Sequence, residues 1–159
     1  MSHHLVEAVG LTHVYEDGTA ALRDVNFRIT HGESVAIIGA NGAGKSTLLL
    51  HLNGHLAPTR GEVRIGETPI APSTLATIRR TVGLVFQDPD DQLFMPTVFE
   101  DVAFGPRNLG LPEPDVERRV REALESVGAW HVRDRPPYRL SGGEKRRVAI
   151  AGVLAMSPD

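Results

Sequence analysis

The segment from residue 39 to residue 47 is Gly39-Ala40-Asn41-Gly42-Ala43-Gly44-Lys45-Ser46-Thr47. It fits the pattern G-x-x-x-x-G-K-[ST] at every fixed position. The apolar run Val35-Ala36-Ile37-Ile38 precedes it, and Leu48-Leu49-Leu50 follows. A strand-like run, a glycine loop and a helix-like run in this order are typical of a loop that holds phosphate groups. We therefore expect an α/β fold with a P-loop core, in which a mixed or parallel sheet is covered by helices.

The residue types in this loop suit the binding of a triphosphate. Gly39, Gly42 and Gly44 lack Cβ, so the backbone can approach an anion closely and adopt positive φ. The helix that starts near Gly44 directs its unpaired N–H groups and the positive end of its dipole at the anion. Lys45 can reach the β- and γ-phosphates, and the Ser46 hydroxyl can ligate Mg²⁺. The alternative interpretation is a glycine-rich turn that binds nothing.

Composition excludes several other classes of function. The chain has 159 residues, of which 41% are hydrophobic, a normal share for one domain. Seventeen Lys and Arg face 20 Asp and Glu, a net charge of -3, so we expect no nucleic-acid partner. There is no cysteine, which excludes disulfides and thiolate metal sites. No apolar run approaches the roughly 20 residues of a membrane span, so we expect any membrane role to come through a partner.

The N-terminal part predicts two strands joined by a turn. Leu5 to Tyr15 and Leu22 to Ile29 alternate apolar and polar residues around the turn-forming cluster Glu16-Asp17-Gly18-Thr19. Tyr15 lies at the edge of this turn. Periodicity favours a half-buried strand aromatic, and the other interpretation is a ring that stacks on a base.

The segment after the phosphate loop predicts a helix over Lys45 to His55, with its leucines on one stripe. His51 and His55 are four residues apart on this helix, so both could face one metal ion. Histidine pairs without a third ligand are more often surface or packing residues, and we favour that interpretation.

The middle of the chain predicts a strand over Glu62 to Gly66, a helix over Ser73 to Arg80 and a buried parallel strand over Val82 to Phe86. Ligands of open α/β sheets gather at the carboxyl ends of strands, so Gln87 is placed to approach a phosphate or its metal ion. The alternative is a solvated turn formed by the acidic residues that follow.

From Leu93 to Leu140 the pattern changes to helices and loops. Thr97 to Phe104 is a candidate short helix, and a clear amphipathic helix follows Pro114 with its apolar stripe ending at Val127. Gly128 closes that helix. We interpret the region as an α-helical subdomain inserted into the core, and expect the boundaries 1–87, 88–143 and 144–159.

A second helix start follows this region, at Leu140-Ser141-Gly142-Gly143-Glu144. Ser141 has the character of an N-cap, and Glu144 is its capping-box partner three residues on. Two glycines weaken the first turn of a helix, so a cap alone does not account for them. They make sense if a second anion approaches this helix start closely.

Together these motifs resemble the ATP-binding cassette ATPases, the nucleotide-binding subunits of ABC transporters. Residues 39–47 resemble Walker A, Gln87 the Q-loop glutamine, and Leu140 to Glu144 the ABC signature, with Glu144 where glutamine is usual. Tyr15 falls where the family has its adenine-stacking aromatic. The resemblance therefore favours base stacking for Tyr15 and implies ATP with Mg²⁺ as the cofactors.

A narrower resemblance concerns Phe86 to Phe94 and Glu100 to Pro106. Both stretches are similar to the ATPases of energy-coupling factor importers, which take up cobalt, nickel or vitamins. The implied function is an ATP-binding subunit that drives import from the cytoplasmic face of the membrane. The alternatives are a soluble ABC-type ATPase, or a non-hydrolysing fragment that only binds ATP or a partner.

The resemblance also implies a site shared by two subunits. Family members form head-to-tail dimers in which Walker A of one subunit and the signature of the other enclose each ATP. Lys45 and Gln87 are then the implied catalytic residues, and Ser46 and Gln87 the implied metal ligands. Ser141, Gly142, Gly143 and Glu144 would contact the nucleotide from the opposite subunit, alongside Tyr15, all nine residues of the loop and Gln87.

Membrane subunits are the other implied partners. Phe94, Met95 and Phe99 are apolar candidates for that contact, with core packing as the equal alternative. The sequence ends at Met156-Ser157-Pro158-Asp159, where relatives continue into Walker B and the catalytic glutamate. We therefore expect an incomplete ABC ATPase domain without an assignable catalytic base, whose central sheet has unpaired edges.

Overall fold

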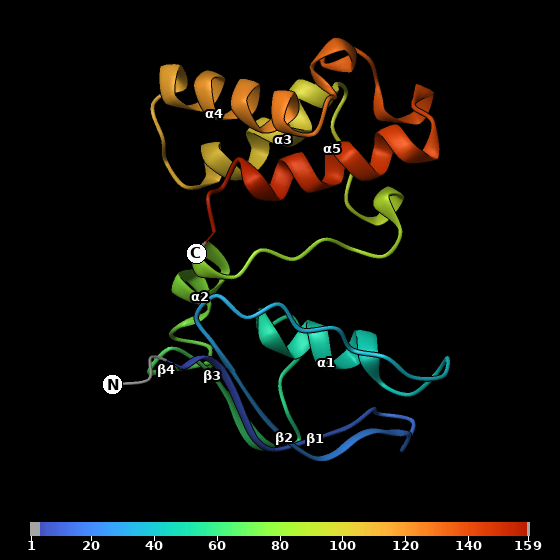
Figure 1. The fold of residues 1–159 in the computed structure, drawn as a ribbon, viewed down its shortest axis with the longest axis vertical. Coiled ribbons are helices and arrows are strands. Elements are labelled where there is room, and N and C mark those ends of the chain that lie inside the picture. Colours follow the sequence, from blue (N-terminus) through green and yellow to red (C-terminus); the bar gives the residue numbers. More distant parts are fainter. Residues whose placement is uncertain (1–3, 159) are drawn as a thin grey trace. The chain divides into compact units, whose positions relative to one another are not determined.

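The computed structural model describes residues 4–158, and it divides into two compact units (Figure 1). One unit extends to Val82 and the other begins at Gly83. The first contains the sheet and the phosphate-loop pattern, and the second contains the helical region and the signature motif. The expected three-part division places its first boundary later, after residue 87, and assigns the last helix to the core.

The first unit is built on a four-stranded antiparallel sheet. Its strands are β1 (His4–Val14), β2 (Ala20–Thr30), β3 (Arg60–Ile65) and β4 (Thr68–Pro69), in the order β2-β1-β3-β4. Tyr15 N donates to Thr19 O at 2.9 Å and Gly18 N donates to Tyr15 O at 2.9 Å, which closes the turn between the first two strands. The predicted hairpin is confirmed.

Helix α1 (Lys45–Leu52) packs on this sheet, and Figure 1 shows it beside the strands. Leu48 and Leu52 pack against a buried cluster from the strands, formed by Ala8, Leu11, Leu22 and Val63. A shorter helix, α2 (Leu75–Thr81), follows β4 and buries Ile78. The phosphate loop is thus held between a packed sheet and a packed helix.

Two predicted strands are wrong: residues 35–38 and 82–86 carry no strand in the structure. Ile38 is 91% exposed, and Val35 and Val85 are also exposed. A strand needs a neighbour for its backbone N–H and C=O groups, and no described strand runs beside either segment. Their apolar character is therefore not matched by burial within residues 4–158.

The second unit is helical. Its helices are α3 (Val98–Asn108), α4 (Glu113–Ser126) and α5 (Gly142–Leu154). The short 3-10 turn η1 (Pro89–Asp91) precedes α3, and η2 (Trp130–Val132) and η3 (Pro137–Arg139) lie between α4 and α5. The three helices share one core, which includes Val98, Val102, Val116, Val120, Ala123, Leu124, Val148, Ala151 and Ala155. The apolar stripe predicted on the amphipathic helix is confirmed, and Gly128 follows that helix with φ +68°.

Residues 83–92, which include η1, pack against α5 and are hydrogen-bonded to it through Gln92. Gln92 donates from Nε2 to Ala149 O at 2.8 Å and accepts at Oε1 from Phe86 N at 3.1 Å. A Cβ on Gly83 would collide with Val153, so this segment lies against the end of α5. α5 therefore belongs to the helical unit. Among the described residues, no helix combines the length and the apolar character that a membrane span needs.

Candidate functional site

The glycine loop before α1 adopts the backbone conformation that its sequence predicts. Gly42 has φ +79° and Gly44 has φ +88°, a region that residues with a Cβ rarely adopt. A Cβ on Gly44 would also collide with the carbonyl oxygen of Ala21. The loop consequently passes so close to the start of β2 that only glycine fits there.

The start of α1 has no cap of its own. Gly44 is the N-cap residue and supplies no side-chain hydrogen bond, so N–H groups of the first turn have no partner within the helix. Lys45 donates from Nζ to the carbonyl oxygens of Gly39, at 2.9 Å, and Ala40, at 2.7 Å. Its ammonium therefore lies over the loop, and one further proton remains available to an anion.

These features fit a bound triphosphate with its metal ion. The open N–H groups and the Lys45 ammonium are donors only, which suits phosphate oxygens. Ser46 is exposed on the first turn, and a hydroxyl oxygen is a ligand that Mg²⁺ accepts. Among the described residues, no three His, Asp or Glu side chains gather as a separate metal site.

Tyr15 lies beside this loop in the structure. Its hydroxyl and Thr47 Oγ1 are 2.9 Å apart, and the residue is 39% exposed. An aromatic ring and the glycine loop thus meet within one unit, although the loop starts 24 positions after Tyr15. This proximity suits a molecule with both a base and phosphates.

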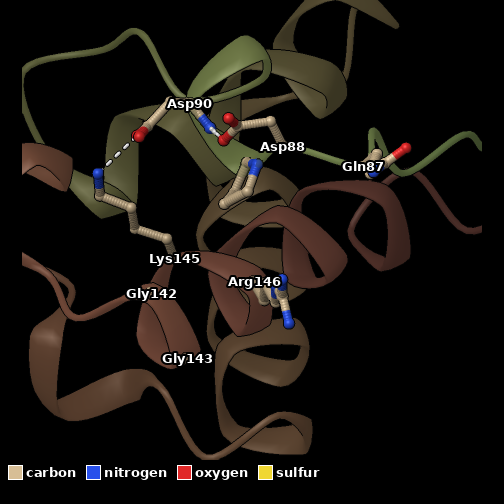
Figure 2. A pocket seen from close by; sticks show the side chains of 8 residues that line it. Gln87, Asp88, Asp90, Gly142, Gly143, Lys145 and Arg146 are labelled. Atoms are coloured by element: carbon tan, nitrogen blue, oxygen red, sulfur yellow. Dashed lines mark hydrogen bonds and ion pairs between the residues drawn. The ribbon is translucent and has the colours of Figure 1, made fainter.

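Three of the other predicted site residues, Gln87, Gly142 and Gly143, line one pocket in the second unit. Gln87, Asp88, Asp90, Gly142 and Gly143 line a pocket of about 600 Å³ together with Pro89, Lys145 and Arg146. Figure 2 shows Lys145 reaching from α5 to Asp90, and the Nζ to Oδ1 distance is 2.6 Å. Gln87, Gly142 and Gly143 therefore open onto the same pocket.

The start of α5 carries the capping box that the sequence predicts. Glu144 N donates to Ser141 Oγ at 3.3 Å, and Ser141 N donates to Glu144 Oε2 at 2.8 Å. The hydrogen bond from the Ser141 side chain lowers the pKa of the Glu144 carboxyl. Both side chains are engaged in the cap, and their contact with a nucleotide stays a prediction.

Two buried histidines, His13 and His51, lie beside Thr47; the packing role that we favoured for His51 is confirmed, whereas His13 was not singled out from the sequence. α1 ends at Leu52, so His51 and His55 do not share a helical face, and the metal-pair alternative is wrong. His51 instead lies buried, with Nδ1 2.7 Å from Thr47 O and Nε2 3.2 Å from His13 Nδ1. No sequence signal links His13 to His51, because 38 residues separate them.

Asp101 is a second residue that the sequence did not single out. Its Oδ1 accepts hydrogen bonds from Phe94 N at 3.0 Å and Met95 N at 3.1 Å. Burial raises the pKa of this carboxyl, and Oδ2 has no partner in the part of the chain that the structure describes. Asp101 thereby fixes the backbone that presents Phe94, which is 65% exposed. Phe99, in contrast, packs against the helical core.

The family described as ABC transporter matches residues 22–159 of this chain. An ABC transporter ATP-binding protein of Geobacter sulfurreducens is 74% identical over 159 residues, all of this chain and 64% of that protein. The energy-coupling factor transporter ATP-binding protein EcfA of Methanocaldococcus jannaschii is 58% identical over 98% of this chain and 57% of its own length. The chain thus spans about 60% of these relatives.

Solved structures agree with these matches. CbiO1 from Clostridium perfringens, part of the ABC transporter complex cbiONQ, is 44% identical with a TM-score of 0.85, over 98% of this chain and 63% of that one. A dimeric ATP-binding cassette bound to ADP and Pi in a post-hydrolysis state is 33% identical, also with a TM-score of 0.85, over 96% and 70% of the two chains. The predicted fold class is confirmed.

Proposed function

Since this chain belongs to the ABC transporter ATPase family, we propose that it forms the nucleotide-binding part of a subunit that binds and hydrolyses ATP to drive transport. The observation that carries the proposal is the uncapped start of α1, with the Lys45 ammonium over the loop and the Tyr15 ring beside it. An aromatic platform, a phosphate loop and a lysine meet here within one unit.

Each residue of the site has a proposed task. The loop N–H groups and Lys45 hold the phosphates and offset their negative charge, and the Tyr15 ring stacks on adenine. Ser46 offers a hydroxyl oxygen to the Mg²⁺ ion, which when bound neutralises charge on the phosphate oxygens. Gln87, in the second unit, has the proposed task of orienting the attacking water. The residue that accepts the proton of that water is not assigned in this chain.

A second ATPase subunit completes the site in this proposal. The signature residues Ser141, Gly142 and Gly143 approach the phosphates from the opposite subunit, with Glu144 holding the helix start. Support comes from the dimeric cassette with ADP and Pi, which is 33% identical to this chain. ATP would join the two subunits, and its hydrolysis would release them because the bridging charge is removed.

The transport system we propose is an importer of the energy-coupling factor type, attached to the cytoplasmic face of the membrane through its partners. Its cargo would be a small substrate such as cobalt, nickel or a vitamin. The similarity to an EcfA protein and to CbiO1 supports this class. Phe94 and the Phe104 ring, with centroids 5.0 Å apart, form an exposed apolar surface that suits a membrane-subunit helix, with Met95 beside it.

ATP affinity of the Lys45→Ala variant tests the central part of the proposal. Loss of a charge-assisted donor to phosphate should weaken ATP binding about 10- to 100-fold. Lys145→Ala is a matched control, because Lys145 lies at the other helix start and is paired with Asp90. Its affinity for ATP as a monomer should stay within about twofold of wild type. Unchanged binding by the Lys45 variant would overturn the assignment of the loop.

A further inference from the structure

Four residues of the first unit contact one another in a closed circuit, partly through the Thr47 backbone, which we term the histidine ring. Tyr15 Oη meets Thr47 Oγ1 at 2.9 Å, and Thr47 O meets His51 Nδ1 at 2.7 Å. His51 Nε2 meets His13 Nδ1 at 3.2 Å, and the His13 ring packs edge-on against the Tyr15 ring with centroids 4.7 Å apart. The series of contacts in the histidine ring thus starts and ends at Tyr15, the proposed base-stacking residue.

The acceptors in the histidine ring fix the protons. Thr47 O can only accept, so His51 Nδ1 carries a proton. The Ala57 carbonyl oxygen, 3.2 Å from His13 Nδ1, likewise requires a proton on that nitrogen. The single proton on His13 Nδ1 is then shared between Ala57 O and His51 Nε2, so His51 Nε2 accepts and His51 is a neutral imidazole protonated at Nδ1. Each contact between the two histidines and Thr47 therefore has a single direction.

Burial makes this arrangement costly to keep. His51 is 1% exposed, and His13 and Thr47 are each 8% exposed. Burial is the main cause that lowers the pKa of His51. His13 Nε2 has no hydrogen-bond partner within the described range. An apolar pair of similar volume would fill this space without those polar groups, so the directional contacts are what the histidines add.

We propose that His13 and His51 are positioning residues that hold the Tyr15 ring in a fixed orientation relative to Thr47, so that base and triphosphate are bound by one pre-organised unit. The inference rests on the proposed function, because it assumes that Tyr15 meets the base. His13 limits rotation of the ring from its edge, and Thr47 anchors its hydroxyl. His51 joins the two anchors by binding the Thr47 backbone and the His13 ring.

A pre-organised platform makes a prediction that packing alone does not. Fixing the ring before binding lowers the entropy cost of stacking a base, but it does little for a ligand without a base. Removing a contact of the histidine ring should therefore weaken the binding of ATP more than the binding of inorganic tripolyphosphate. A loss of packing that disturbs the phosphate loop would lower the affinity for both ligands equally.

The test is a double-mutant cycle on the Kd of the full chain for ATP, with tripolyphosphate as the base-free probe. Tyr15→Phe removes the hydroxyl contact and His51→Leu removes both contacts of His51. These two residues do not contact each other in the histidine ring, so any coupling passes through Thr47 and His13. Each single variant should raise the Kd for ATP about three- to tenfold and the Kd for tripolyphosphate less than about twofold.

In the double variant, the loss of ATP affinity should be no larger than the greater single loss. His51→Asn is the variant to use if the leucine variant unfolds, because its amide can still donate to Thr47 O and only the link to His13 is lost. His31→Ala, an exposed histidine in the turn after β2, is the matched control and should match wild type.

Two results would overturn the inference while leaving the proposed function intact. One is independent losses that multiply in the double variant, and the other is an equal loss for ATP and tripolyphosphate. Wild-type protein that binds neither ligand would instead overturn the proposed function. If wild-type protein bound tripolyphosphate as tightly as ATP, Tyr15 would not contribute to binding through the base, and the inference would be overturned.

Discussion

Helices α1 and α5 both begin in glycine-containing segments, but their first turns are satisfied in different ways. α1 follows Gly44, which offers no cap, so its open N–H groups face the loop. α5 follows Ser141, whose side chain and that of Glu144 complete a capping box. The N–H groups in the first turn of α1 therefore need a ligand as hydrogen-bond partner, whereas the first turn of α5 is capped by its own side chains.

The glycines at the two starts differ as well. Gly44 is required by its positive φ and by the nearby carbonyl of Ala21. Within residues 4–158, a Cβ added to Gly142 or Gly143 would meet no atom within 4 Å outside its chain neighbours and the backbone of its own helix, so the fold does not require these glycines. The signature glycines leave room for another molecule, which agrees with the proposed approach of ATP from a second subunit.

The largest expected difference between the two starts comes from alanine at each glycine. Gly44→Ala should abolish measurable ATP binding and lower the free energy of unfolding by about 2 to 4 kcal/mol, through backbone strain and the collision with Ala21. Gly142→Ala should leave stability unchanged or raise it by about 0.5 to 1 kcal/mol, because alanine favours a helix. Urea unfolding of both variants measures this, and equal destabilisation would contradict the comparison.

A smaller effect is expected from removal of the α5 cap. Ser141→Ala deletes the acceptor for Glu144 N and should cost about 1 kcal/mol of unfolding free energy. Ser46→Ala, in the first turn of α1, should cost less than about 0.5 kcal/mol because that serine makes no cap. Thermal unfolding compares the two variants. A larger loss for the Ser46 variant would contradict the assigned caps.

The smallest effect is a pH dependence at the α5 start. The folded pKa of Glu144 is lowered, mainly by the Ser141 side chain, so its contribution is present above the ordinary carboxyl pKa of about 4.3. That contribution is lost as pH falls through the lowered folded value. Glu144→Gln keeps a capping-box partner without the charge. Its urea midpoint should therefore fall less than that of wild type between about pH 5 and about pH 3, and parallel curves would contradict this.

Local patterns in the sequence were enough for the hairpin, the helices and the α5 cap. The loop at Gly44 was also predictable, because its chemistry depends on neighbouring residues. Residues 35–38 and 82–86 were not, because a strand depends on a neighbour that their own sequence does not specify. The family resemblance pointed to Tyr15 as a base-stacking residue but not to its contact with Thr47, and the contact between His13 and His51 had no local signal.

The most direct measurement is an ATP titration of ¹⁵N-labelled protein, followed through its backbone amide signals. We predict that the amides of Gly42 to Thr47 shift at every protein concentration, because the start of α1 binds ATP within one subunit. The amides of Gly142 and Gly143 should shift only as the protein concentration is raised and a second subunit is engaged. Loop amides that stay unchanged at saturating ATP, or signature amides that shift first in dilute protein, would contradict the account.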